Sequence, residues 1–178
     1  ADGRVATRNY IGILVCSNCA ATVARKISEY FTEERLTEYP NIDGVVPFIT
    51  ELGCGMEQSG EPLALLQRTI AGYIRNPNMG ASVLVSLGCE RNNIDKLMDA
   101  QDLHETELFK RMVIQEVGGT KAAVTRGIEM VKQMLPLVNA VKREPCSAEH
   151  LCVALECGGS DGFSGLSANP ALGKAMDI

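Results

Sequence analysis

Short apolar runs alternate with amphipathic segments along most of this chain, and this alternation restricts the fold more than any other feature. Segments with apolar residues at helical spacing, such as 20–36 and 120–141, predict helices. Between them, short apolar segments predict strands at 11–16, 45–49, 82–87, 111–115 and 151–155. The segment at 11–16 is a continuous apolar run, consistent with a strand buried on both faces. Strands joined through helices form right-handed crossovers with helices on both faces of the sheet. We therefore predict a three-layer, doubly wound, mostly parallel α/β sheet of about five strands, which is Rossmann-like.

Nothing in the composition or spacing divides the chain. It has no charge run, low-complexity linker or repeat, so we expect a single α/β domain over residues 1–178. Residues 1–9 lead almost at once into the first strand, and a last helix has barely begun at Ile178. We therefore expect the central fragment of a longer polypeptide, whose N-terminal and C-terminal portions are its partners.

Charge and composition exclude several classes of partner. A formal net charge of −5 repels a phosphate backbone, so we expect no nucleic acid. No uncharged stretch approaches the length of a bilayer span and no signal peptide is recognisable, so we expect no membrane partner and a cytoplasmic location. Assembly into a homo-oligomer stays open.

The seven cysteines are an odd number in a chain without secretory features, which favours reduced thiols over a disulfide framework. Each thiol is then either a small buried hydrophobe or a ligand or nucleophile. Ligands of an open α/β sheet bind beyond the carboxyl ends of the strands. Four of the five expected strands are followed by a turn that carries cysteine, and these turns contain Cys16, Cys19, Cys54, Cys89 and Cys157.

This joint placement favours a functional site over scattered core thiols. Three or four thiolates that meet from separate loops would bind iron or zinc, or hold an iron–sulfur cluster. The turn at 156–165 is the densest in glycine, hydroxyl and carboxylate groups, and the alternative for Asp161 is a local Asx-turn.

Other site classes find little support. Cys16-Ser17-Asn18-Cys19 has the spacing of a redox motif but lacks its aromatic and proline context. A dinucleotide fingerprint would need glycine where Gln58 stands. His104 and His150 lie away from the strand-end turns, so serine or cysteine hydrolase chemistry lacks its usual base.

The strand-end motifs resemble those of the altronate/galactarate dehydratase family, over nearly all of the chain. The matching segments are Arg8-Asn9, Gly53-Cys54-Gly55, Ser86-Leu87-Gly88-Cys89-Glu90, Ile114-Gln115-Glu116, Gly118-Gly119-Thr120, Cys157-Gly158-Gly159-Ser160-Asp161-Gly162-Phe163-Ser164-Gly165 and Ala168-Asn169-Pro170-Ala171. The resemblance implies the central domain of a sugar-acid dehydratase that converts altronate or galactarate to a 2-keto-3-deoxy acid. It also implies a divalent metal, Fe²⁺ with Mn²⁺ as the alternative. Thr50 stands where the family commonly has histidine.

The family reaction suggests roles for the strand-end residues. As a hypothesis, Cys19, Cys54, Cys89 and Cys157 bind the metal or an iron–sulfur cluster. Asp161 or Glu90 transfers the proton, and the substrate is bound by Asn18, Ser160 and Asn169. Three alternatives remain: a sulfo-lyase of the same family, a non-catalytic scaffold lobe, and a thiol redox protein that pairs Cys16 with Cys19.

Overall fold

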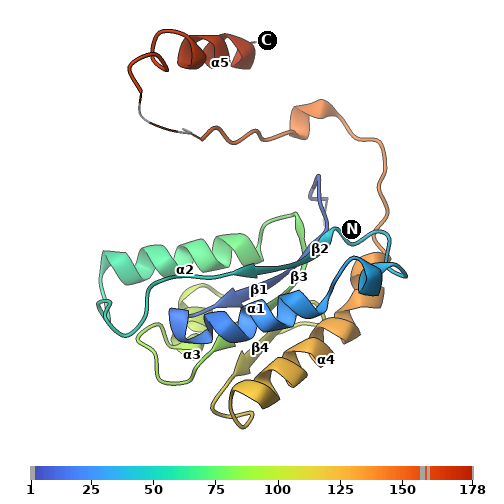
Figure 1. The fold of residues 1–178 in the computed structure, drawn as a ribbon, viewed down its shortest axis with the longest axis vertical. Helices are drawn as coiled ribbons and strands as arrows, with labels where there is room; N and C mark the ends of the chain where they lie inside the picture. The colour runs from blue at the N-terminus through green and yellow to red at the C-terminus, as the bar shows by residue number, and fades with distance from the viewer. Residues whose placement is uncertain (1–2, 157–158, 160, 178) are drawn as a thin grey trace. The chain divides into compact units, whose positions relative to one another are not determined.

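The chain forms an α/β fold around a parallel sheet. A computed structural model describes residues 3–156, 159 and 161–177. Its sheet has four strands in the order β2-β1-β3-β4 (Figure 1). Their bounds are β1 (Tyr10–Val15), β2 (Gly44–Phe48), β3 (Met79–Ser86) and β4 (Phe109–Val113). The prediction of a doubly wound, three-layer α/β fold is confirmed, with four strands instead of five.

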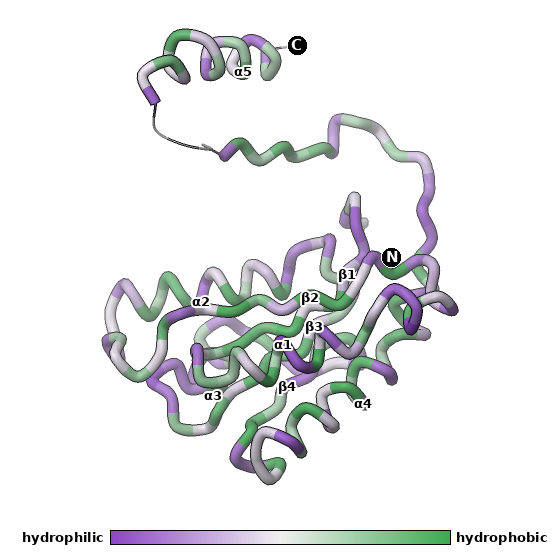
Figure 2. Tube along the Cα trace, viewed as in Figure 1, coloured by the Kyte–Doolittle hydropathy of each residue, from purple (hydrophilic) through white to green (hydrophobic). Residues whose placement is uncertain are grey.

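Helices cover both faces of the sheet. On one face lie α1 (Ala21–Tyr30) and α4 (Thr120–Asn139), which pack on Ile11, Ile13 and Val15 of β1. On the other face lie α2 (Glu61–Ile74) and α3 (Ile94–Ala100), which pack on Leu14 of β1 and Leu84 of β3. Alternate side chains of a strand point to opposite faces, so the continuous apolar run fills two cores. Figure 2 shows hydrophobic residues along the central strands and both kinds of residue on the helices, as expected for amphipathic cover.

Short 3₁₀ turns complete the connections: η1 (Asn18–Ala20) precedes α1, η2 (Glu34–Leu36) follows it, and η3 (Ala148–His150) lies beyond α4. The helix predicted over 20–36 therefore consists of α1 and η2. None of the described helices is long and apolar enough to cross a lipid bilayer.

Pro47 lies inside β2, and the sheet order explains why it is tolerated. β2 is an edge strand, and Pro47 is in register with Ile13 of β1. Proline has no N–H to give to a ladder, so it fits in strands at the edge of a sheet, where one side needs no partner. The same residue in β1 or β3 would interrupt the centre of the sheet.

Gly127 allows α4 to approach α1 closely. A Cβ at this position would collide with Cδ1 of Ile27 and lie 2.9 Å from its Cγ1. Ile27 is fully buried, so its side chain can move only against other core residues. Glycine is therefore required here for packing between the helices, even though it weakens a helix interior.

We expect Gly127→Ala to lower the free energy of unfolding by about 1–2 kcal/mol, because overpacking outweighs the gain in helix propensity. The matched control is Gly72→Ala in α2, where a Cβ would meet nothing within 4 Å. That change should raise stability by up to about 1 kcal/mol. Urea denaturation of both variants measures the difference, and equal effects would contradict the packing role of Gly127.

The predicted fifth strand at 151–155 is wrong. The described residues there form no strand, and Leu151, Val153 and Leu155 are each more than half exposed. Apolar, β-branched composition makes a segment suitable for a strand, but pairing and burial decide whether one forms. The chain divides into two compact units, Ala1–Pro145, which contains the whole sheet, and Cys146–Ile178, which contains η3 and α5 (Ala168–Met176).

Candidate active site

The sheet has one topological switch point, between β1 and β3. The chain leaves β1 toward β2 on one side, and β3 and β4 follow on the other side. In open α/β sheets a crevice forms beyond the carboxyl ends of two such strands, and ligands bind there. In this protein the two loops at that crevice are 16–20, after β1, and 87–93, after β3. The first contains Asn18 and Cys19, and the second contains Cys89 and Glu90.

Hydrogen bonds join the loops that follow all four strands. The N–H of Asn18 donates to the carbonyl of Leu52 at 2.8 Å, which ties the loop after β1 to the loop after β2. Nε of Arg91 donates to the carbonyl of Cys54 at 3.4 Å, which ties the loop after β3 to the loop after β2. Nε2 of Gln115, after β4, lies 3.8 Å from Sγ of Cys89. Segments that are far apart in the sequence are therefore held together at one edge of the sheet.

Gly88 permits the tight turn after β3. Its φ is +121°, a conformation that residues with a side chain rarely adopt. A Cβ there would also lie 2.7 Å from Oε1 of Gln115 and 3.0 Å from Cγ1 of Val113. The close approach of Gln115 to Cys89 thus depends on glycine at position 88.

Glu90 holds this turn with its carboxylate. Oε1 accepts the N–H of Leu87 at 2.8 Å, and Oε2 accepts the N–H of Gly88 at 2.6 Å. Only 6% of the residue is exposed. Both oxygens therefore orient the Cys89 loop, and the carboxylate itself is fixed in position.

Cys16 is a core residue. It is fully buried in the hydrophobic core on the sheet face that α2 and α3 cover. Burial raises the pKa of its thiol strongly, and the negative charge of Glu90 raises it further. A thiol that stays protonated is a poor nucleophile. A redox pair of Cys16 with Cys19 is therefore unfavourable.

Asn92 connects three parts of the site. Its Nδ2 donates to the carbonyl of Cys16 at 3.0 Å, and its Oδ1 accepts from Nε2 of Gln67 on α2 at 3.2 Å. Asn92 is 1% exposed. A buried amide with both ends bonded fixes the loop after β3 against β1 and α2.

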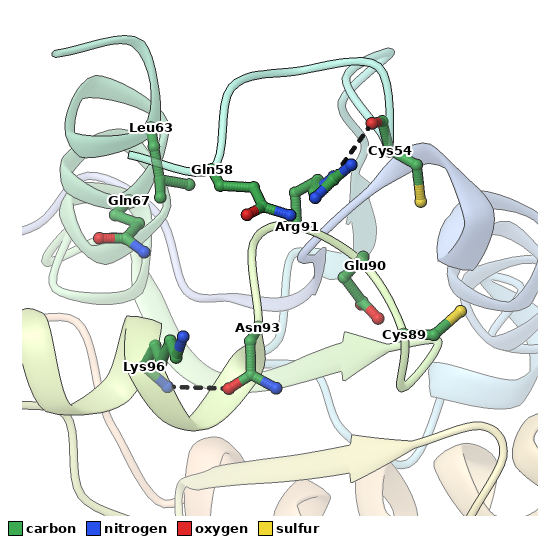
Figure 3. Close-up of a pocket in the computed structure, with 9 residues that line it drawn as sticks. All are labelled: Cys54, Gln58, Leu63, Gln67, Cys89, Glu90, Arg91, Asn93 and Lys96. Carbon is green, nitrogen blue, oxygen red and sulfur yellow. Dashed lines mark hydrogen bonds between the residues drawn. The ribbon is translucent and has the colours of Figure 1, made fainter. Parts of the chain in front are cut away.

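A cavity of about 500 Å³ lies between α2 and the loop after β3 (Figure 3). Its size is in the range of roughly 300–1,000 Å³ found for small-molecule sites. The loop after β2 and α2 contribute four lining residues, Cys54, Gln58, Leu63 and Gln67. The loop after β3 and the start of α3 contribute five, Cys89, Glu90, Arg91, Asn93 and Lys96.

The cavity has two chemically different ends. Figure 3 shows Sγ of Cys54 and Sγ of Cys89 at one end, and Lys96 and Gln67 at the other. The lining carries two cationic side chains and one carboxylate, in a chain whose net charge is −5. This local excess of positive charge favours an anionic ligand.

The predicted site residues are distributed over both units. The first unit contains Asn18, Cys19, Cys54, Cys89 and Glu90, of which the last three line the cavity. Asp161 and Asn169 belong to the second unit. Cys157 and Ser160 lie outside the described residues.

Within the second unit, Asp161 forms an Asx-type turn. Oδ1 accepts the N–H groups of Phe163 and Ser164, each at 2.8 Å, and Oδ2 accepts the hydroxyl of Ser164 at 2.5 Å. The bond from the Ser164 hydroxyl is the main cause that lowers the pKa of Asp161, and the two backbone bonds add to it. Asn169 lies in the first turn of α5, where its N–H donates to the carbonyl of Ser164 at 2.8 Å.

The thiols of the described residues do not complete a metal site. No group of three or more His, Cys, Asp or Glu side chains that could hold a metal ion occurs in residues 3–156, 159 and 161–177. Cys54 and Cys89 provide two soft donors at one end of the cavity, whereas thiolate sites for zinc or iron–sulfur clusters use about four. The metal and its four-cysteine ligand set stay predictions.

Thiol exposure predicts a clear pattern of alkylation. Cys19, Cys54 and Cys89 are exposed and should react with iodoacetamide in the native protein. Cys16 should react at least about 100-fold more slowly than these three, because a buried, protonated thiol reacts only when the structure opens. Mass spectrometry of native and urea-unfolded protein measures this pattern. Fast labelling of Cys16, or a Cys16–Cys19 disulfide after mild oxidation, would contradict the assignment of Cys16 to the core.

Fold and cavity together define a doubly wound α/β domain with a cavity of small-molecule size beside the loop that follows β3. The chain belongs to the family described as D-galactarate dehydratase/altronate hydrolase, second domain, whose family model matches residues 1–139. The model described as D-galactarate/altronate dehydratase, C-terminal, matches residues 148–178. The resemblance seen in the strand-end motifs is thereby confirmed.

Curated relatives agree with this family. Altronate dehydratase of Escherichia coli (strain K12) is 33% identical over 99% of this chain and 34% of its own length. Galactarate dehydratase (L-threo-forming) of the same strain is 35% identical over 100% of this chain and 35% of its own length. The beta subunit of (2R)-sulfolactate sulfo-lyase from Chromohalobacter salexigens is 27% identical over 99% of this chain and 41% of its own length. The chain thus spans about a third of the length of the two dehydratases.

Sequence reasoning missed several residues of the cavity. Arg91 and Lys96 were not predicted, although Arg91 directly follows the Gly88-Cys89-Glu90 turn. Gln58 was named only as the residue that stands where a dinucleotide fingerprint needs glycine. Asn92 and Gln67 belong to helical segments by pattern, and no spacing signal indicates that their amides meet.

Proposed function

We propose that this chain forms part of the active centre of a sugar-acid dehydratase, a hydro-lyase that acts on a substrate of the altronate or galactarate type. The observation that carries the proposal is the cationic, thiol-edged cavity between α2 and the loop after β3 of a domain that belongs to this family. The substrate class comes from the names of the relatives.

The proposed reaction removes water from a 2,3-dihydroxy acid. The C2–H bond breaks and its electron pair forms the C2–C3 double bond, while the C3–O bond breaks and the hydroxyl leaves as water after it receives a proton. The resulting enol becomes a 2-keto-3-deoxy acid when C3 takes up a proton and the hydroxyl on C2 loses one. A divalent metal, when bound, would supply a Lewis acid for the departing oxygen.

Glu90 is our candidate for the proton-transfer step. It lines the cavity, and two backbone N–H groups fix its carboxylate. An ionised carboxylate has about four acceptor positions, so two remain for a substrate proton. Asp161, the other candidate, likewise has both oxygens bonded within its own turn, so the choice of Glu90 rests on its place in the lining of the cavity. Asn18, Ser160 and Asn169 stay candidates for substrate contact.

The test is an assay of the full-length protein with altronate and galactarate, in which the 2-keto acid is detected by its semicarbazone. We expect turnover of at least one sugar acid. The isolated 178-residue chain serves as the comparison, since it spans about a third of its dehydratase relatives. Absence of turnover with a panel of sugar acids would contradict the proposal and favour a non-catalytic lobe.

The metal prediction has its own measurement. Iron is quantified after anaerobic preparation of the full-length protein and of four single Cys→Ser variants, at Cys19, Cys54, Cys89 and Cys157. We expect iron to fall in the variants that lose a ligand. Unchanged iron in all four would remove the thiolate assignment.

A second candidate comes from the sulfo-lyase relative, which matches 99% of the chain. Elimination of sulfite also begins with a proton lost beside a carboxylate, so the same cavity would serve. Sulfolactate is therefore included in the assay, and release of sulfite without sugar-acid turnover would favour this function.

A further inference from the structure

We propose that Arg91 and Lys96 form the carboxylate-binding subsite of the cavity. The inference rests on the proposed function and names the residues that would recognise the acid group of its substrate. Both side chains line the cavity, one from the loop after β3 and the other from the first turn of α3 (Figure 3).

The two cations have no ion-pair partner among the described residues. Some other cations of the first unit are paired: Arg111 pairs with Asp95 and Glu105, and Arg143 pairs with Asp43. The bond found for the Arg91 side chain joins Nε to the carbonyl of Cys54, which leaves its two terminal nitrogens for a ligand. A planar guanidinium with free N–H groups matches the two oxygens of a carboxylate.

The carboxylate in the cavity does not neutralise these cations by direct contact. Glu90 uses both oxygens for the backbone N–H groups of Leu87 and Gly88. It is the one acidic residue in the described lining of the cavity. Two cations that face a cavity with no carboxylate bonded to them provide charge for an anionic guest.

The amides around the cations suit a polyhydroxylated guest. Gln58 lines the cavity with its carboxamide, and its side chain has no bonded partner in the described part of the chain. In contrast, Gln67 is held by Asn92, and Oδ1 of Asn93 accepts the N–H of Lys96. One available amide beside two cations can bind a sugar hydroxyl next to the acid group.

This assignment orients the substrate. Arg91 lies toward Cys54, whose carbonyl accepts from its Nε, and Lys96 lies at the opposite end of the cavity (Figure 3). An acid group held between these two cations would leave the following carbons to extend toward Glu90 and Cys89. The carbons that react are the two nearest the carboxylate. They would then lie beside Glu90, between the two ends of the cavity.

The experiment is calorimetric titration of the full-length protein with galactarate, and with galactitol, which has the same hydroxyls and no carboxylate. The variants are Arg91→Gln, Lys96→Gln and Arg91→Lys. Lys142→Gln is the matched control, because it removes the same charge from an exposed lysine outside the cavity.

We expect Arg91→Gln and Lys96→Gln each to raise Kd for galactarate by about 10- to 100-fold, because each change removes a charge-assisted hydrogen bond. Arg91→Lys should recover part of the affinity, and Lys142→Gln should change Kd less than about 2-fold.

Each result decides the proposal. Variants at 91 and 96 that bind galactarate as tightly as the unchanged protein would overturn it, and so would a protein that binds no sugar acid or binds galactitol equally well. Thermal melting of each variant shows that the fold is intact. Because binding is measured apart from turnover, a protein that binds galactarate through Arg91 and Lys96 but does not dehydrate it would overturn the proposed function and support this subsite.

Discussion

Replacement of Glu90 by glutamine is expected to lower kcat of the full-length protein for sugar-acid dehydration by about 100-fold or more. A positioned proton-transfer group contributes about 10²- to 10⁴-fold to a rate, and an amide cannot take up the C2 proton. Glutamine also has one acceptor oxygen where Glu90 uses two, so one of the N–H groups of Leu87 and Gly88 would face an NH₂ group. Steady-state kinetics with galactarate or altronate measures the effect.

Two controls separate chemistry from structure. Glu116→Gln changes an exposed carboxylate after β4 that does not line the cavity, and it should alter kcat less than about 2-fold. Glu90→Asp keeps a carboxylate at a shorter reach and should retain more activity than Glu90→Gln. Full activity of a folded Glu90→Gln protein would exclude Glu90 from proton transfer and leave Asp161 as the candidate.

Replacement of Asn92 by leucine is expected to lower the free energy of unfolding by about 2–5 kcal/mol. The change leaves the carbonyl of Cys16 and Nε2 of Gln67 without their partner, and each unsatisfied buried group costs about 1–3 kcal/mol. Because Asn92 joins the loop after β3 to β1 and α2, the cavity should lose its shape as well. Urea denaturation and binding of galactarate measure the two effects.

The neighbouring Asn93 provides the control for this change. Its Oδ1 caps α3 by accepting the N–H of Lys96 at 3.1 Å, and Asn93→Ala should cost about 1 kcal/mol. The double variant Asn92→Leu with Gln67→Leu should lose less than the sum of the single changes, because both members of one bond are then replaced by apolar groups. Additive losses would contradict the bond between Asn92 and Gln67.

The core strands could be predicted from the sequence because their physical signal is local. β1 and β3 are continuous apolar runs that are buried on both faces, and such runs require helices above and below them. The run at 151–155 has the same composition, yet it pairs with no described strand. Strand pairing also requires a neighbouring strand with free backbone groups, and the composition of one segment does not show whether such a neighbour is present.

The loops of the site could be predicted from the position of strand ends, but the individual roles could not. Cys16 and Cys89 both follow a strand, yet Cys16 points into the core and Cys89 lines the cavity. Cys16 directly follows the last residue of β1, whereas Cys89 lies three residues beyond the end of β3, in a turn. Arg91 and Lys96 have no sequence pattern that separates them from surface cations, since only the tertiary structure places both at one cavity.

A crystal structure of the full-length protein with galactarate bound would test the proposed site. We predict electron density for the sugar acid between α2 and the loop after β3, with a carboxylate at Arg91 and Lys96 and the next carbons beside Glu90. Galactarate bound elsewhere, with the cavity lined by Cys54 and Cys89 free of ligand, would contradict it.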